Sequence, residues 1–91
     1  MKEISYEQKI VLLVDLLREV RLRARVTQGD LAGRIGMRQT DISKIEKGVR
    51  RIDAVELMHW VEALDQDLYA FFAEFKRRVK ALGSTRRRIA G

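Results

Sequence analysis

Apolar side chains recur along this chain with the period of an α-helix. Near the amino end one stripe follows i, i+3, i+4, i+7 spacing: Ile10, Leu13, Val14, Leu17 and Ala24. A second stripe beside it consists of Leu12, Leu16 and Val20. The last segment repeats the pattern with Leu68, Phe71, Phe72, Phe75, Val79 and Leu82. No alternating run is long enough for a strand, so the chain is predicted to be all-α, with its first helix covered on more than one side.

Capping signals divide this pattern into separate helices. Thr27 and Asp53 each stand three residues before an acid, which is the spacing of a capping box at a helix start, and Asp67 can open the last helix. Gly36 and Gly48 stand where a left-handed residue commonly ends a helix. These signals predict five helices, over residues 6–24, 27–34, 38–47, 53–64 and 67–81.

The length of 91 residues suits one small domain with a thin core, on which an exposed apolar face would indicate a partner chain. We assign residues 1–82 to this domain. Residues 83–91 include Arg86, Arg87 and Arg88 and have little to bury, so they are predicted to form a disordered basic tail. That tail is interpreted as a solvated end, a nonspecific DNA arm or a partner-docking segment.

Composition excludes several kinds of site. The chain has no cysteine, and its one histidine, His59, has no second ligand at helical spacing, so neither a metal nor a cofactor is expected. No carboxylate pair, glycine-rich phosphate loop or nucleophile–base set indicates an enzyme. No apolar run approaches the roughly 20 residues that cross a bilayer. The polar start, Met1–Lys9, is unlike a secretory signal, so a cytoplasmic location is expected.

The charges are divided into three blocks. Residues 1–52 contain 12 basic and 7 acidic side chains, residues 53–75 contain six acids and no Lys or Arg, and residues 76–91 contain seven bases and no acid. Such a chain is expected to have one basic and one acidic face. A basic face favours a polyanion such as nucleic acid, with membrane surfaces and plain solubility as rival interpretations.

Two short predicted helices meet at Gly36. Ala32 is small where they would cross closely, and the apolar inner faces consist of Leu31, Ile35, Met37, Ile42 and Ile45. This is the layout of a helix-turn-helix unit, whose second helix enters the major groove of DNA. Short helix pairs are common, so the layout alone leaves other functions open.

The stretch from Leu17 to Leu64 resembles the lambda-repressor-like (Xre) family of helix-turn-helix regulators. The matching positions are Leu17-Arg18, Arg21, Thr27-Gln28, Leu31-Ala32, Ile35-Gly36, Ile42-Ser43, Ile45-Glu46, Gly48 and Glu56-Leu57. The resemblance covers about half of the chain. It implies a compact five-helix DNA-binding domain in which the second and third helices form the helix-turn-helix.

Arg21 and Glu46 are charges on apolar helix faces. Arg21 falls on the stripe of the first helix, and Glu46 follows Ile42 and Ile45 on the inner side of the third. One buried charge is costly, whereas two of opposite sign can satisfy each other. The resemblance implies this ion pair; two unrelated surface charges are the alternative.

Four residues at and near the start of the third helix are the candidates for reading bases: Arg38, Gln39, Thr40 and Lys44. Arginine or lysine can bond guanine O6 and N7, glutamine can bond adenine N6 and N7, and threonine can contact a thymine methyl. The resemblance implies that Gln28 contacts a phosphate and braces Gln39. A merely solvated face is the alternative for both glutamines.

Candidate phosphate contacts surround this helix. They are Gln28, Ser43, Lys47, Arg50 and Arg51, and they are expected to fix the register of the protein on DNA without carrying sequence information. Asp41 can accept from cytosine N4, but an acid at that position is more often solvated or helix-capping.

Two residues depart from the family pattern, and a third is unfavourable in its predicted helix. Arg25 stands where relatives often have glycine, and Arg38 where they have a serine or threonine cap. Loss of that cap costs about 0.5–2 kcal/mol, which favours added DNA contacts as the explanation. Gly33 inside a helix is unfavourable by up to about 1 kcal/mol, and close approach of a neighbour is the only explanation we find in the sequence.

Five of the six aromatic residues lie within 16 positions of the carboxyl half: Trp60, Tyr69, Phe71, Phe72 and Phe75. Part of this set must be core, but the adjacent phenylalanines occupy more than one face of the last helix. A thin domain with surplus aromatics favours a homodimer interface. A two-fold pair would place two reading helices about 34 Å apart, one turn of DNA.

The function predicted is that of a dimeric, sequence-specific transcriptional regulator, a repressor that occupies a pseudo-palindromic operator on double-stranded DNA. The alternatives are the DNA-binding antitoxin of a toxin–antitoxin pair, which would co-purify with its toxin, and a restriction–modification controller. A protein-interaction module that has lost DNA binding is the alternative from another class.

Overall fold

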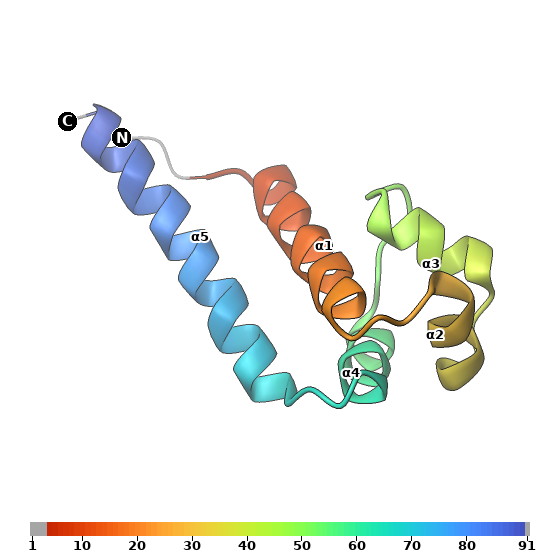
Figure 1. Ribbon diagram of the computed structural model, residues 1–91. Coiled ribbons are helices and arrows are strands. Elements are labelled where there is room, and N and C mark those ends of the chain that lie inside the picture. The colour runs from red at the N-terminus through yellow and green to blue at the C-terminus, as the bar shows by residue number, and fades with distance from the viewer. Residues whose placement is uncertain (1–3, 91) are drawn as a thin grey trace.

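Five α-helices and no strands make up the described part of the chain (Figure 1). The computed structural model describes the backbone of residues 4–90 and the side chains of residues 4–83. The helices are α1 (Tyr6–Arg23), α2 (Gln28–Ile35), α3 (Gln39–Glu46), α4 (Ala54–Ala63) and α5 (Leu68–Ala90). The all-α prediction is confirmed, and each bound of α1 to α4 lies within one residue of its predicted position.

Side-chain caps fix the helix starts. At α4 the Asp53 carboxylate accepts from Glu56 N at 2.7 Å and Glu56 Oε1 accepts from Asp53 N at 3.1 Å, which is a full capping box. At α2 the Thr27 hydroxyl accepts from Asp30 N at 3.0 Å, one half of the predicted box. Asp67 accepts from the amide of Ala70 at the start of α5. These bonds satisfy amides that would otherwise lack a partner in the first turn.

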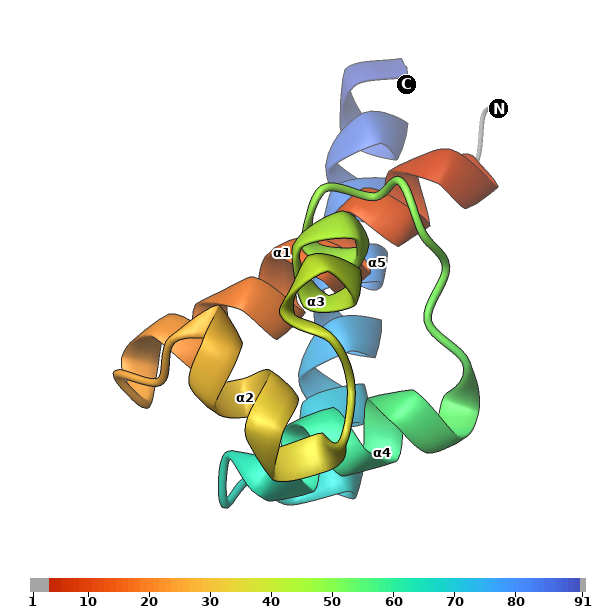
Figure 2. The ribbon, with the colours of Figure 1, turned by 90° about the vertical axis from the view of Figure 1, so that its right-hand side faces the viewer.

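The core lies where α1, α2, α3 and α4 meet, with α1 between α5 and the α2–α3 pair (Figures 1 and 2). Trp60 on α4 is fully buried, and its indole Nε1 donates to the carbonyl of Leu17 on α1 at 3.3 Å. The other fully buried side chains are Leu16, Leu17, Leu31, Ile42, Ile45 and Val61. Because these residues come from all four helices, the core fixes the position of α3.

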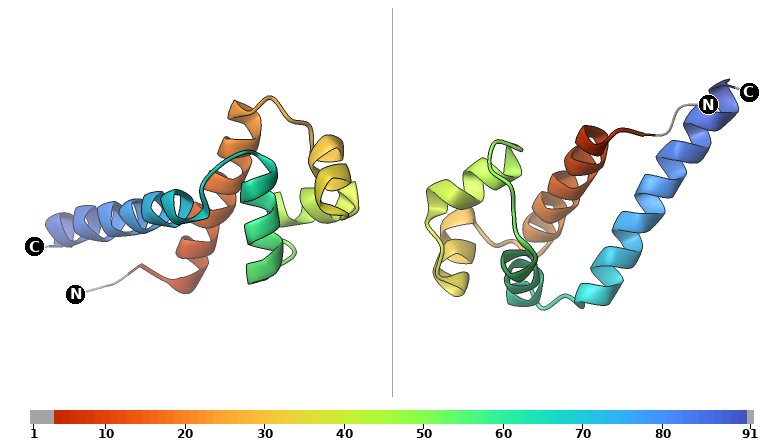
Figure 3. Two further views of the ribbon diagram at one scale, coloured as in Figure 1. Left: turned by 90° about the horizontal axis from the view of Figure 1, so that it is seen from below. Right: turned by 180° about the vertical axis from the view of Figure 1, so that it is seen from behind.

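Helix α5 is longer than the sequence predicts. It continues to Ala90, so the predicted end near residue 81 and the disordered tail over 83–91 are wrong for residues 83–90, while Gly91 lies outside the described residues. Residues 76–90 are rich in Lys and Arg, which are good helix formers, and the chain has no proline. The carboxyl-terminal half of α5 projects away from α2, α3 and α4, and the molecule measures 47 × 25 × 21 Å (Figure 3).

An ion cluster joins α5 to α1. Arg78 Nη1 donates to Glu19 Oε2 at 2.8 Å, and Arg78 Nε donates to Glu74 Oε2 at 2.7 Å. Hydrogen bonds from Arg77 and Arg78 lower the pKa of Glu74 to about 2, so this carboxylate stays ionised in mildly acidic solution. All three members of the Glu19–Arg78–Glu74 cluster keep a quarter or more of their side-chain surface exposed, and we therefore expect it to orient α5 rather than to supply much stability.

Gly33 lies on α2 with open space around it. A Cβ built there meets no atom within 4 Å, so the close approach expected from the sequence is wrong. We predict that Gly33→Ala raises the free energy of unfolding by about 0.5–1 kcal/mol, because alanine loses less backbone entropy in a helix. Urea denaturation measures this change. The contrasting variant is Gly36→Ala, which should destabilise by about 1–2 kcal/mol because its φ is +70°; a loss of stability in Gly33→Ala would contradict the prediction.

Candidate nucleic-acid interface

Helices α2 and α3 form a helix-turn-helix. Gly36 ends α2 in the left-handed conformation, and the amide of Met37 donates to the carbonyl of Ala32 at 3.0 Å, which turns the chain into α3. Ile42 and Ile45 on the inner side of α3 are fully buried. The four predicted base-reading side chains, Arg38, Gln39, Thr40 and Lys44, are all exposed. Figure 2 shows α3 at the surface of the molecule, with no other helix in front of it.

Arg21 and Glu46 form a buried ion pair between α1 and the end of α3. Arg21 Nε donates to Glu46 Oε2 at 2.6 Å and Arg21 Nη2 donates to Glu46 Oε1 at 2.9 Å, so the pair is bidentate. Only 8% and 4% of the two side chains are exposed. Arg21 Nη1 also donates to the carbonyl of Val26. Because each charge has its partners inside the protein, the pair attaches α3 to α1 at a defined position.

A chain of hydrogen bonds runs from this pair to the exposed face of α3. Glu46 Oε1 accepts from Gln28 Nε2 at 2.9 Å, and Gln28 Oε1 accepts from Gln39 Nε2 at 2.7 Å. The structure therefore brings together the two glutamines that the sequence predicts to cooperate. Gln39 donates one of its two amide hydrogens to Gln28, and its other hydrogen and Oε1 suffice for adenine N7 and N6.

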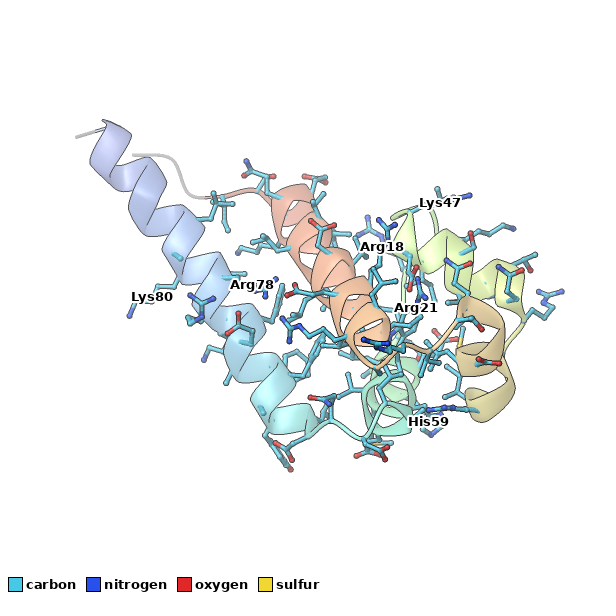
Figure 4. All side chains as sticks on the ribbon, viewed as in Figure 1. Arg18, Arg21, Lys47, His59, Arg78 and Lys80 are labelled. Atoms are coloured by element: carbon cyan, nitrogen blue, oxygen red, sulfur yellow. The ribbon has the colours of Figure 1, made fainter. Side chains whose placement is uncertain are left out.

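A hollow of about 210 Å³ lies beside the buried pair, between α1, α2 and α3. It is lined by Arg18, Arg21, Gln28, Ser43, Glu46 and Lys47. Arg18 and Lys47 approach it from α1 and from the residue after α3, and Figure 4 shows both on the same side of the molecule. Arg18 was not among the predicted site residues. Its spacing of three residues from Arg21 places it one turn away on the same face of α1, and that spacing is the signal that would have found it.

Arg50 and Arg51 occupy different environments. Arg50 Nη1 and Nη2 donate to the two carboxylate oxygens of Glu56 at 3.0 and 2.8 Å, and these bonds lower the pKa of Glu56. Arg50 therefore connects the loop after α3 to α4. The sequence instead predicts a phosphate contact for this residue. The guanidinium of Arg51 lies 4.9 Å from the centre of the Tyr6 ring and remains exposed.

Comparisons with known proteins agree with this geometry. The family model of a helix-turn-helix domain matches residues 15–74, from the middle of α1 into α5. The chain is 34% identical to the XRE-family like protein from Pseudomonas syringae pv. tomato str. DC3000, with a TM-score of 0.76 over 80% of this chain and 89% of that one. The chain belongs to the XRE family of helix-turn-helix proteins. The predicted resemblance is confirmed.

The fold of this XRE-family chain also occurs in the restriction–modification controller protein C.Esp1396I. The wild-type controller is 24% identical, with a TM-score of 0.74 over 84% of this chain and 97% of that one. The same controller as a tetramer in complex with its natural 35 base-pair operator is 24% identical, with a TM-score of 0.72 and the same coverage. At this identity the likeness shows the fold alone. No curated protein matches the chain in sequence.

Two of the five aromatics predicted to form a dimer interface belong to the core of this XRE domain. Trp60 is fully buried and Phe71 is 5% exposed, so the prediction is wrong for both. Phe75 is partly buried against the same core. Tyr69 and Phe72 are 84% and 40% exposed, and the Phe72 ring makes edge contacts with Phe71 and Phe75. Tyr69 and Phe72 remain the candidates for a contact with a second copy.

Residues 4–90 give no indication of a membrane or metal site. No helix among them is long and apolar enough to span a bilayer. Within the same residues no three histidine or acidic side chains gather where they could hold a metal ion. His59 is exposed on α4.

Proposed function

We propose that this XRE-family protein is a dimeric, sequence-specific DNA-binding regulator that represses transcription by occupying a pseudo-palindromic operator. The observation that carries the proposal is the exposed face of α3. It is held at a defined position by the buried Arg21–Glu46 pair and by the hydrogen bonds that run from Glu46 through Gln28 to Gln39. A reading element must hold its donors in place before it meets the bases, because each mobile side chain loses rotamer freedom on binding. This function requires no catalytic group. Because the proposed ligand is double-stranded DNA, we propose a cytoplasmic location.

The base contacts come from the first two turns of α3. Gln39 is assigned to adenine, because Gln28 already orients its amide. Arg38 and Lys44 are assigned to guanine, and Thr40 to a thymine methyl. These side chains are exposed, whereas the next two inward positions, Ile42 and Ile45, are buried, so only one face of the helix is available to the groove.

The phosphate contacts flank that face. Gln28 is the first residue of α2, and the start of a helix favours an anion. Arg18, Ser43 and Lys47 line the adjacent hollow and supply two positive charges and a hydroxyl. Arg51 adds a further exposed charge on the loop after α3. We assign Arg50 a supporting position in this set, because Glu56 neutralises it.

A second copy would pair through α5. Tyr69 and Phe72 leave aromatic surface exposed on the first two turns of this helix, and exposed aromatic patches are typical of interfaces. Two-fold symmetry would then set two copies of α3 about 34 Å apart, so that both enter the major groove on one side of the DNA.

Selection of bound duplexes from random DNA tests the proposal. The expected result is one enriched inverted repeat, with half-site centres separated by about 10–10.5 base pairs. Bases within each half-site should include an adenine and a guanine, because the donors of α3 suit these two. No enriched sequence at moderate ionic strength would contradict the proposal.

Control of a restriction–modification system is a second candidate function. It is favoured by the shared fold with the controller C.Esp1396I, which binds its operator as a tetramer. A controller would select two adjacent inverted repeats, and its gene would stand beside those of a methylase and a nuclease. A single repeat without such neighbours would favour the general repressor.

A further inference from the structure

Asp41 occupies an unusual position on α3. It lies in the first turn of the helix, one residue before the buried Ile42, and only 18% of its side chain is exposed. An arginine lies near each of its two carboxylate oxygens. Arg38 Nε donates to Asp41 Oδ2 at 3.2 Å, and Arg50 Nε lies 3.7 Å from Asp41 Oδ1. The carboxylate is therefore a shared partner of a candidate base-reading arginine and a loop arginine.

The partner of Asp41 on the loop, Arg50, is itself fixed in position. Arg50 is fixed by its two bonds to Glu56, and Glu56 in turn closes the capping box at the start of α4. The row Glu56–Arg50–Asp41–Arg38 alternates in charge from the start of α4 to the start of α3. Only its last member, Arg38, is largely exposed, with 84% of its side chain open to solvent.

The bond to Asp41 determines which hydrogen-bond donors of Arg38 remain available for DNA. The Nε–H of Arg38 is occupied, and the two terminal amino groups stay available at the far end of the planar guanidinium. This pair of donors matches guanine O6 and N7 in an end-on bidentate contact. A free arginine of this exposure would sample many rotamers and present either edge of the guanidinium.

The carboxylate also acts against nonspecific binding. An acid on the DNA-facing helix repels phosphates and partly neutralises the charge of Arg38. Orientation of the arginine and repulsion of the backbone both raise the ratio of specific to nonspecific affinity.

We propose that Asp41 is a positioning residue that sets specificity for guanine through Arg38. The inference rests on the proposed function and names one base contact within it. The other interpretation of Asp41 is a favourable acid in the first turn of α3, which would support the helix equally for every DNA sequence.

The test compares four proteins on the selected operator: wild type, Asp41→Asn, Arg38→Ala and the double variant. Competition binding is measured against operators altered one base pair at a time and against random duplex DNA. We expect Asp41→Asn to lose about tenfold in preference for guanine at one position while binding random DNA as tightly as wild type or more tightly. Arg38→Ala should lose the same preference, and the double variant should lose no more than Arg38→Ala alone.

The matched control is Asp30→Asn, which removes an exposed acid from the first turn of α2 with no arginine bonded to its side chain among the described residues. It should change affinity for all sequences alike. Asp41→Ser, with a helix-compatible hydroxyl, provides a second variant if Asp41→Asn melts at a lower temperature than wild type.

A guanine preference that survives in both Asp41 variants would overturn this inference alone. A uniform loss of affinity over all sequences would overturn it in favour of the helix-supporting acid. A wild-type protein without any preferred sequence would instead overturn the proposed function, and this inference with it.

Discussion

Glu46→Ala is expected to lower the free energy of unfolding by about 3–5 kcal/mol, because it leaves the Arg21 guanidinium buried without its partner. A domain of this size has a total stability of about 5–15 kcal/mol, so the variant should lose a large part of its stability. The bond that Glu46 accepts from Gln28 is lost as well. Urea denaturation followed by circular dichroism measures the change.

The double variant Arg21→Met, Glu46→Leu provides the control for this prediction. It replaces both charges by apolar side chains and leaves no buried charge without a partner, so it should recover most of the stability. It should still bind DNA more weakly than wild type, because Gln28 no longer has Glu46 as an acceptor and Gln39 is then less well oriented. A loss below about 1 kcal/mol in Glu46→Ala would mean that the pair is exposed to water in solution.

Phe72→Glu is expected to separate the proposed dimer and to weaken operator binding by about 100-fold or more. The physical reason is that the second half-site is bound within one assembly at a high effective concentration, which a monomer does not have. Phe72 is suited to this test because it is 40% exposed, whereas the neighbouring Phe71 is 5% exposed and would disturb the core. Sedimentation measures the mass and gel shift measures the affinity.

Val11→Glu is the matched control. Val11 is a 54% exposed apolar residue on α1 that is not part of the proposed Tyr69–Phe72 contact, and the same acidic side chain there should leave mass and affinity unchanged. A Phe72→Glu protein that sediments as a dimer, or a wild type that sediments as a monomer on its operator, would contradict the pairing through α5.

The sequence was sufficient to predict most of the local structure. Helix starts at Thr27 and Asp53 and the end at Gly36 depend on side-chain and backbone preferences within a few residues, and the structure has all three. These starts and this end were predictable because their physical cause lies in the residues themselves. The contact of Arg21 with Glu46 spans 25 positions, and it was implied by the family resemblance, with which the cost of burying either charge alone agrees.

Other features depend on tertiary packing that no periodic pattern records. Trp60 and Phe71 have the same apolar character as Phe72, but the first two are buried in the core and the third is 40% exposed. Arg50 pairs with Glu56 across a loop, where no regular spacing relates the two residues. The end of α5 was missed because basic composition was interpreted as disorder, although Lys and Arg are also good helix formers.

The measurement that tests the central claim most directly is selection of bound duplexes by wild type, Gln39→Ala and Lys44→Ala in parallel. The account predicts one motif for the wild type. Each variant should lose its base preference at a different position and retain the rest, while its melting temperature stays unchanged. The same motif from all three proteins would contradict the claim that the exposed face of α3 reads DNA sequence.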